Sequence, residues 1–549
     1  MIGALDRPGI ETPNVAARMS AMARAQPERD AVIVPDGTGW RRLTFAELEE
    51  ESDRLAWGLE AIGVGRGVRT VVMVKPSLEF FSLMFALFKA GAVPVLIDPG
   101  IGKRALLRCL DEVEPEAFIG IPAAHVARVL FPGPFRKLRA LVTVGRRLGW
   151  GGHDLASLRE AGARGGPYPI AAPGRDDPAA ILFTSGSTGV PKGAIYTHAI
   201  FDAQVRSIRD LYGFEPGEVD VATFPPFALF DPALGATAVV PRMDARRPAS
   251  ADPAEIVRAI VEHGATSLFA SPALLDNLSH HAEREGVRLS GLRRILSAGA
   301  PVRPDILARM QTALENGVEI HTPYGATEAL PVASVGSREA LEAAEATARG
   351  AGICVGRPAP GTEVRILRIS DGPIEAWSHE LEAPPGEVGE IAVAGEVVTP
   401  AYFARPEQTR LAKIREGDRI VHRMGDLGYF DDRGRLWMCG RKSQRVRTAK
   451  GTLFTERVEQ VYNRHPSVRR SALVGVPHGA DPARAVLVVE PEGRVDAEVL
   501  VRELREMPSP FPVEAILIHR RGFPVDARHN AKIERERLAE WARRRLEIL

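Results

Sequence analysis

The sequence contains little cysteine: only Cys109, Cys354 and Cys439 occur in 549 residues. The three positions are widely separated and follow no metal-ligand or disulfide spacing. This excludes a small secreted fold held together by disulfides. We expect three buried thiols in a reducing cytosol.

Long apolar segments are also absent. The most apolar run, residues 80–88, stops at Lys89 and is shorter than the roughly 20 residues that a membrane-spanning helix needs. Residues 1–14 have neither the basic start nor the apolar stretch of a secretion signal. We therefore expect no transmembrane segment, no secretion and a cytoplasmic location, with residues 80–88 forming a buried helix.

The chain has almost no net charge, because 71 Lys and Arg residues balance 70 Asp and Glu residues to a formal +1. This gives no reason to expect nucleic acid or an anionic membrane as a partner. At this length a chain exceeds the size at which one core stops growing, so two or more domains are expected.

Strand and helix patterns alternate along the chain. Thr44 and Glu47 have the spacing of a capping box, which predicts a helix from there to about Leu59. Such alternation predicts an α/β fold with doubly wound, mainly parallel sheets flanked by helices. Residues 149–177 are rich in Gly, Pro and Arg and are expected to form a surface connection. The predicted strands of the first part are residues 30–34, 70–74, 93–97, 117–119 and 140–143.

The most informative stretch is residues 184–193, Thr-Ser-Gly-Ser-Thr-Gly-Val-Pro-Lys-Gly, which follows an apolar strand-like segment. Its glycines let backbone N–H groups approach phosphate oxygens, its hydroxyls add donors, and Lys192 supplies positive charge. It is not a Walker A loop, because Pro191 precedes the lysine and Gly193 follows it. A flexible surface turn is the alternative, but the flanking strands and the single lysine favour a phosphate-binding loop.

This motif resembles the signature loop of the adenylate-forming enzymes, the superfamily of acyl-CoA synthetases, peptide-synthetase adenylation domains and luciferases. Five further blocks in matching order extend the resemblance over most of the chain. The resemblance implies a large N-terminal domain, residues 1–440, that binds ATP and the acyl substrate. It also implies a small mobile α+β C-terminal domain, residues 441–549, which is joined by a hinge and carries the catalytic lysine.

The second strong block is residues 321–328. Tyr324 offers a face for stacking on adenine, Thr327 a hydroxyl for the α-phosphate, and Glu328 an oxygen ligand for Mg²⁺. Read alone, the block also fits a turn before a helix. By resemblance, Asp426 accepts the ribose hydroxyls and Arg441 contacts the ribose. The full set assigned to ATP is Thr184, Ser185, Gly186, Ser187, Thr188, Gly189, Lys192, Gly299, Ala300, Pro301, Tyr324, Gly325, Thr327, Asp426 and Arg441.

The C-terminal part carries the residue with the largest expected role in catalysis. Lys532 matches the catalytic lysine of the family, and Lys192, Thr327 and Glu328 complete the predicted catalytic set. Ser443 occupies the hinge position, where relatives have Asp or Lys. That difference leaves the extent of domain rotation open.

Two segments have two interpretations each. The aromatic run at residues 224–232 matches the acyl pocket of relatives, with Phe227, Ala228 and Phe230 as its lining, although Phe-rich runs are also typical of cores. Ala228 replaces a common histidine, which would widen a tunnel for an alkyl chain. The Ala- and Glu-rich residues 338–349 predict a helix, which either borders the substrate entrance or is a solvated surface helix.

Among adenylate-forming enzymes, the sequences around residues 96–100, 224–235 and 523–533 are most similar to the β-lactone synthetases of bacterial long-chain olefin biosynthesis. The resemblance implies that ATP and Mg²⁺ activate a long-chain 2-alkyl-3-hydroxy acid and that its own hydroxyl closes a β-lactone. Other enzymes of that olefin pathway are possible partners. The alternatives are a long-chain acyl-CoA or acyl-carrier-protein ligase and a non-catalytic nucleotide-binding protein, although the latter would be expected to lack Glu328, Asp426 or Lys532.

Overall fold

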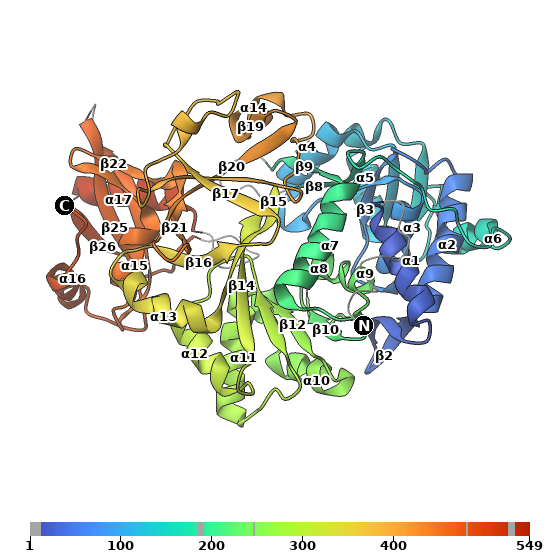
Figure 1. Cartoon of the computed structure of the whole chain (residues 1–549), viewed down its shortest axis with the longest axis horizontal. Helices are drawn as coiled ribbons and strands as arrows, with labels where there is room; N and C mark the ends of the chain where they lie inside the picture. The colour runs from blue at the N-terminus through green and yellow to red at the C-terminus, as the bar shows by residue number, and fades with distance from the viewer. Residues whose placement is uncertain (1–12, 184–190, 245–246, 479–480, 525–532, 549) are drawn as a thin grey trace.

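The structure, a computed structural model, describes residues 13–183, 191–244, 247–478, 481–524 and 533–548. Two large sheets and their helices form the first four fifths of the chain, and a smaller α+β unit lies at the C-terminal end (Figure 1). This confirms the predicted fold class.

The seven-stranded sheet has the order β7-β6-β5-β3-β4-β8-β9. All its neighbours are parallel except β8 and β9. The segment that joins β8 to β9 contains the predicted phosphate loop. The strands are β3 Arg69–Met73, β4 Val93–Leu96, β5 Ala117–Gly120, β6 Ala140–Thr143, β7 His153–Asp154, β8 Pro178–Phe183 and β9 Gly193–Thr197.

The fourteen-stranded sheet is parallel on one side, from β1 to β14, with β2 added antiparallel at its edge. Beyond β14 every pairing is antiparallel, which the expected parallel pattern did not anticipate. Its strands are β1 Asp30–Asp36, β2 Gly39–Thr44, β10 Val219–Ala222, β11 Thr237–Val239, β12 Ser267–Ala270, β13 Arg294–Ser297, β14 Glu319–Ala326, β15 Ala329–Gly336, β16 Ile353–Pro358, β17 Thr362–Leu367, β18 Gly389–Gly395, β19 Lys413–Glu416, β20 Arg419–Phe430 and β21 Leu436–Arg441.

Helices cover these sheets, and two of them test sequence predictions directly. In α2 the Thr44 hydroxyl and the Glu47 carboxylate form both bonds of the capping box. In α3 every residue except Glu79 is buried, so the run at 80–88 is a core helix as expected. The helices of this part are α1 Val15–Ala25, α2 Phe45–Ala61, α3 Leu78–Lys89, α4 Lys103–Val113, α5 Pro122–Leu130, α6 Leu155–Gly162, α7 His198–Tyr212, α8 Pro225–Ala228, α9 Asp231–Leu234, α10 Pro253–His263, α11 Pro272–Glu285, α12 Pro304–Thr312, α13 Ser337–Ala348 and α14 Pro406–Ala412.

The expectation that residues 149–177 form only a surface connection is wrong. This stretch contains β7 and the helix α6, which packs against α2. Asp154 and Ser157 form a reciprocal cap at the start of α6. The close approach of the helices depends on glycine, because a Cβ at Gly162 would lie 2.0 Å from the Arg54 carbonyl oxygen.

The C-terminal unit has its own core, formed by one face of a three-stranded sheet, β24-β25-β26, and the helices α15 and α16. The helix α17 covers the other face. The predicted helix at 338–349 is present as α13, and it contacts α15 of this unit. The elements are β22 Val446–Thr448, β23 Gly451–Leu453, α15 Thr455–Asn463, β24 Val468–His478, β25 Asp481–Pro491, α16 Ala497–Glu506, β26 Ala515–Ile518 and α17 Arg535–Ile548.

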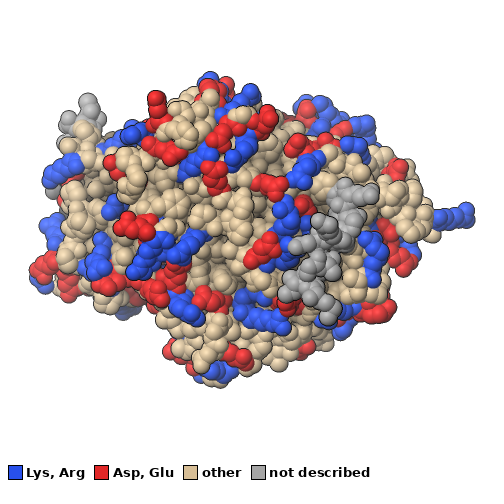
Figure 2. Space-filling view, in the orientation of Figure 1, with Lys and Arg blue, Asp and Glu red and all other residues tan. Residues whose placement is uncertain are grey.

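The surface charge and the helix lengths can be compared with the near-zero net charge and the lack of long apolar segments in the sequence. Figure 2 shows acidic and basic side chains interspersed over one face of the molecule. No helix within the described ranges is long and apolar enough to cross a bilayer. The three cysteines are free and buried, as predicted.

Candidate active site

One short segment, residues 398–403, bonds to strands of both large sheets. On the side of β9, Ile195 N donates to Ala401 O at 3.1 Å, and Phe403 N donates to Gly193 O at 2.7 Å. On the side of β15, Val398 forms a bridge to Ala329. The chain that leaves the predicted phosphate loop is therefore fixed beside the turn between β14 and β15.

The same segment holds Glu328, the predicted metal ligand. Thr399 N donates to the Glu328 carbonyl oxygen at 2.9 Å, and the Tyr402 hydroxyl donates to Glu328 Oε1 at 2.6 Å. Burial and the nearby carboxylate raise the pKa of Tyr402 far above its usual value, so the phenol remains a neutral donor. Lys192 Nζ lies 4.8 Å from the centroid of the Tyr402 ring. One tyrosine thus contacts both the predicted phosphate-binding lysine and the predicted metal ligand.

Thr327 lies next to this group on the β14–β15 turn, where the Tyr196 hydroxyl donates to its carbonyl oxygen at 2.7 Å. The turn is compact, since a Cβ on Gly325 would lie 2.7 Å from the Ala329 carbonyl oxygen. The alternative interpretation of residues 321–328, a turn before a helix, is wrong: the block forms the end of a strand and a hairpin.

A second cluster joins Tyr324, Asp426 and Arg441. The Tyr324 hydroxyl donates to Asp426 Oδ2 at 2.8 Å, and Arg441 Nε lies 3.0 Å from Asp426 Oδ1. Asp426 and Arg441 are register partners on β20 and β21, which explains how residues fifteen apart in sequence form an ion pair. Burial and the carboxylate raise the pKa of Tyr324, and Asp426 raises that of Arg441. The hydroxyl bond fixes the orientation of the Tyr324 ring that we predicted to stack on adenine.

Three further predicted residues follow β13, the strand next to β14. Gly299 has φ +99°, a conformation that favours glycine, and it is exposed together with Pro301, while Ala300 is half-buried. The ends of β13 and β14 thus bring this segment and the Tyr324 cluster to one edge of the parallel half-sheet. Ligands of such sheets bind at this edge.

Several predicted residues cannot be placed. Lys532 lies outside the described residues, and so do the loop residues Thr184, Ser185, Gly186, Ser187, Thr188 and Gly189. Ser443, the predicted hinge residue, is exposed in a short 3₁₀ turn, Lys442–Gln444, that follows β21.

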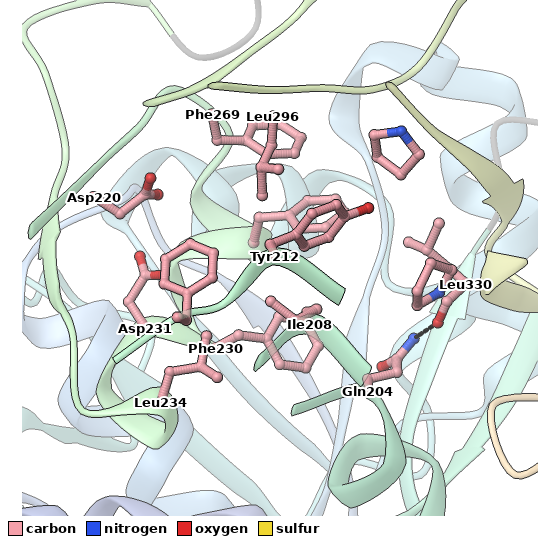
Figure 3. A pocket seen from close by; sticks show the side chains of 14 residues that line it. Gln204, Ile208, Tyr212, Asp220, Phe230, Asp231, Leu234, Phe269, Leu296 and Leu330 are labelled. Atoms are coloured by element: carbon pink, nitrogen blue, oxygen red, sulfur yellow. Dashed lines mark hydrogen bonds between the residues drawn. The ribbon is translucent and has the colours of Figure 1, made fainter. Parts of the chain in front are cut away.

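The aromatic run lines a pocket together with Leu330 and Pro331 of β15 (Figure 3). Phe227 and Phe230 line it, and the Phe227 ring stacks on Phe269 with centroids 4.4 Å apart. Ala228 is fully buried in the core and is not among the lining residues. With a cavity volume of about 40 Å³, the pocket has room for a few water molecules. An alkyl chain would therefore have to displace the aromatic side chains.

Comparison with known proteins identifies the family. Residues 19–403 match the AMP-binding enzyme family. The chain belongs to this family. At the level of single proteins, this AMP-binding enzyme is 53% identical to an olefin β-lactone synthetase of Stenotrophomonas maltophilia, with 97% of this chain and 99% of that protein covered. It is 50% identical to the olefin β-lactone synthetase of Xanthomonas campestris pv. campestris, with 96% and 97% covered.

A solved structure shares the fold. The amide bond synthetase McbA from Marinactinospora thermotolerans superimposes with a TM-score of 0.78 over 96% of this chain and 99% of McbA, at 24% identity. At this identity the likeness supports the architecture alone.

Sequence reasoning missed two residues of the site in this AMP-binding enzyme, Tyr402 and Lys413. Lys413 is buried and donates to the carbonyl and hydroxyl oxygens of Thr399, the residue bonded to the Glu328 backbone. Burial lowers the pKa of Lys413 to about 7. No local motif marks either residue: Tyr402 bonds to Glu328, 74 positions earlier in the sequence, and Lys413 bonds to Thr399, 14 positions earlier.

Two buried carboxyl groups lie on one side of the pocket, Asp220 on β10 and Asp231 on α9 (Figure 3). Burial raises the pKa of Asp220 to about 6. Burial and the proximity of Asp220 raise the pKa of Asp231 well above its usual range. In the unfolded chain both groups ionise near pH 4, so folding becomes less favourable as the pH rises from there toward the folded-state pKa values.

We expect Asp231→Asn to stabilise the fold at pH 7.5 by about 1–3 kcal/mol, since an amide cannot ionise and pays no such penalty. At pH 4 the gain should nearly vanish. Thermal melting at the two pH values measures the difference. The control is Asp202→Asn: Asp202 is paired with Arg18 at 2.6 Å, so its loss should lower the melting temperature at pH 7.5. Equal melting temperatures of Asp231→Asn and the parent protein at pH 7.5 would contradict the prediction.

Proposed function

We propose that the protein uses ATP to convert a long-chain 2-alkyl-3-hydroxy acid into a β-lactone, AMP and diphosphate. The observation that carries the proposal is the 53% identity, over nearly the whole of both chains, to an olefin β-lactone synthetase. The arrangement of Lys192, Tyr402 and Glu328 beside the pocket supports an adenylation step at this place. Enzymes that supply the hydroxy acid or consume the lactone are its expected partners.

In the first step a carboxylate oxygen attacks the α-phosphorus of ATP, and diphosphate leaves. Negative charge is concentrated at the phosphates, so positioning and charge compensation supply most of the catalysis. Lys192 and the hydroxyls of the loop before it are proposed to hold the phosphates. Thr327 offers its hydroxyl to the α-phosphate, and Lys532 from the C-terminal domain is proposed to bridge carboxylate and phosphate.

The nucleoside fits the second cluster. Asp426 would accept hydrogen bonds from the ribose hydroxyls, Arg441 would contact the ribose, and the Tyr324 ring would stack on adenine. Gly299, Ala300 and Pro301 would lie against the base. The bond between Tyr324 and Asp426 supports this assignment, because one contact orients both the ring and the carboxylate.

Glu328 is the proposed Mg²⁺ ligand. Among the described residues no cluster of three or more His, Cys, Asp or Glu is arranged to hold a metal. A single carboxylate fits magnesium, which is commonly bound by one or two carboxylates together with substrate phosphates and water. When bound, Mg²⁺ would offset charge on the phosphates, while Tyr402 keeps the Glu328 carboxylate in place.

In the second step the 3-hydroxyl oxygen attacks the acyl carbon of the adenylate. The new C–O bond closes a four-membered ring, the bond from the acyl carbon to the phosphate oxygen breaks, AMP leaves with the electron pair, and the hydroxyl proton passes to solvent. A nucleophile within the same molecule has a very high effective concentration. A pocket that excludes water protects the adenylate from hydrolysis.

The proposal is tested with the purified protein, ATP, Mg²⁺ and a 2-alkyl-3-hydroxy acid, with and without coenzyme A, and with products identified by NMR. We expect a lactone, AMP and diphosphate without any thiol. A thioester that forms only with coenzyme A would identify an acyl-CoA ligase instead. ATP binding without turnover of any acid would identify a non-catalytic nucleotide-binding protein.

A further inference from the structure

Three buried side-chain oxygen atoms without a hydrogen-bond partner lie around the pocket of Figure 3. They are Gln204 Oε1, Asp220 Oδ1 and Asp231 Oδ2, and no described residue donates to any of them. Each of these residues is at most 5% exposed, and each lines a pocket whose other walls are almost entirely apolar. A buried acceptor without a donor is costly, so the pocket is suited to a ligand that brings a polar hydrogen.

Of these three residues, Gln204 is the one that bonds to the hairpin carrying Thr327 and Glu328, the predicted reaction centre. Its Nε2 donates to the carbonyl oxygen of Leu330 at 3.0 Å, and Leu330 is two residues beyond Glu328 on the hairpin that carries Thr327. This bond fixes the amide: the nitrogen faces Leu330, and Oε1 is left on the other side of the group. The two carboxyl groups lie on the opposite side of the pocket (Figure 3).

A second glutamine, Gln311, has a side-chain amide whose nitrogen and oxygen both form hydrogen bonds within the protein. Gln311 on α12 donates from Nε2 to Val318 O at 2.8 Å, as Gln204 does to Leu330. In contrast to Gln204, its Oε1 also accepts a hydrogen bond, from the Ser337 hydroxyl at 3.2 Å. Anchoring a helix to a strand therefore accounts for the Gln204 nitrogen but not for its unpaired oxygen.

We propose that Gln204 Oε1 accepts a hydrogen bond from the 3-hydroxyl group of the substrate acid. This inference rests on the proposed function, since it assumes an acid whose carboxylate lies beside Thr327 and Glu328. In such an acid the hydroxyl is on the second carbon from the carboxylate, and Gln204 is bonded to Leu330, which lines the same pocket two residues beyond Glu328. Gln204 is thus a substrate-binding residue that selects hydroxy acids and orients the hydroxyl for ring closure.

The selectivity follows from the cost of the unpaired oxygen. A 3-hydroxy acid satisfies Gln204, whereas the same acid without its hydroxyl leaves the acceptor buried and unpaired. Sites built to hydrogen-bond a substrate hydroxyl reject the analogue that lacks it. We expect the parent protein to prefer the hydroxy acid by about 10-fold or more in kcat/KM for diphosphate release.

The test compares Gln204→Leu with the parent protein on two matched substrates, a 2-alkyl-3-hydroxy acid and the 2-alkyl acid without the hydroxyl. We expect kcat/KM for the hydroxy acid to fall by about 10- to 100-fold, and kcat/KM for the acid without hydroxyl to change by less than about 3-fold. The fraction of adenylate that becomes lactone, measured by NMR, should also fall. Gln204→Met, which keeps the side-chain length, serves as the second variant if Gln204→Leu unfolds.

The matched control is Gln311→Leu, which removes a comparable amide bond away from the pocket. It should affect both acids equally. The inference is overturned if Gln204→Leu and Gln204→Met lower kcat/KM for both acids by the same factor. It is also overturned if both variants keep the parent protein's preference for the hydroxy acid. Failure of the proposed function looks different, because then the parent protein itself would form no lactone from the hydroxy acid.

Discussion

Glu328→Gln is expected to lower the rate of diphosphate release from ATP and acid by about 100-fold or more. The amide keeps the shape of the side chain but removes the negative charge that the proposed Mg²⁺ ligand supplies. Tyr402, which now donates to a carboxylate oxygen at 2.6 Å, can donate equally well to the amide oxygen. The fold should therefore be retained, and the loss should come from metal binding.

Magnesium titration separates the metal effect from a general loss of structure. Glu328→Gln should need a much higher Mg²⁺ concentration for half-maximal rate, while Tyr402→Phe, which leaves the carboxylate in place, should cost about 10-fold. Glu396→Gln is the control, because Glu396 is half-exposed and pairs with Arg175 and Arg206 away from this carboxylate. If Glu328→Gln kept the parent rate and Mg²⁺ requirement, Glu328 would not be the metal ligand.

Lys532→Ala is expected to abolish adenylation while ATP binding is largely kept. The proposed ammonium bridges the attacking carboxylate and the α-phosphate, so its charge matters most when the new bond forms. The loss should therefore appear in kcat, with an expected reduction of about 100- to 1,000-fold. Diphosphate release and equilibrium binding of ATP are the two measurements.

A second lysine of the C-terminal unit provides the comparison for charge alone. Lys450→Ala removes an exposed cation of the same C-terminal unit and should leave both measurements unchanged. Unchanged diphosphate release by Lys532→Ala would remove the proposed role of the C-terminal lysine. A parallel loss of ATP affinity would instead place Lys532 among the nucleotide-binding residues.

Much of the fold was predictable because its signals are local. The capping box at Thr44 and Glu47 depends on residues three apart, and the apolar run at 80–88 is long enough to indicate a buried helix. The helix α6 was missed because Gly and Pro on both sides of it dominate the composition. The antiparallel half of the large sheet was missed because strand direction depends on pairing between distant segments.

The same distinction applies to the candidate site. Residues 184–193 and 321–328 form recognisable patterns, and their resemblance to the adenylate-forming enzymes implied Asp426 and Arg441 as well, so a nucleotide site could be predicted from the sequence. Tyr402, Lys413 and Gln204 carry no such pattern. Tyr402 and Gln204 bond to the β14–β15 hairpin, and Lys413 bonds to Thr399, which is itself bonded to Glu328. These contacts exist only in the folded chain.

Side-chain bonds join the C-terminal unit to the part of the chain that precedes it. Arg457 of α15 donates to Gly350 O at 2.7 Å, and Arg445 holds Asp371 with two bonds of 2.7 Å across the junction. A rotation of the C-terminal unit large enough to admit an external thiol would have to break these bonds. If the nucleophile is the hydroxyl group of the substrate itself, no external thiol has to enter. These bonds can then stay intact from activation of the acid until the ring is closed.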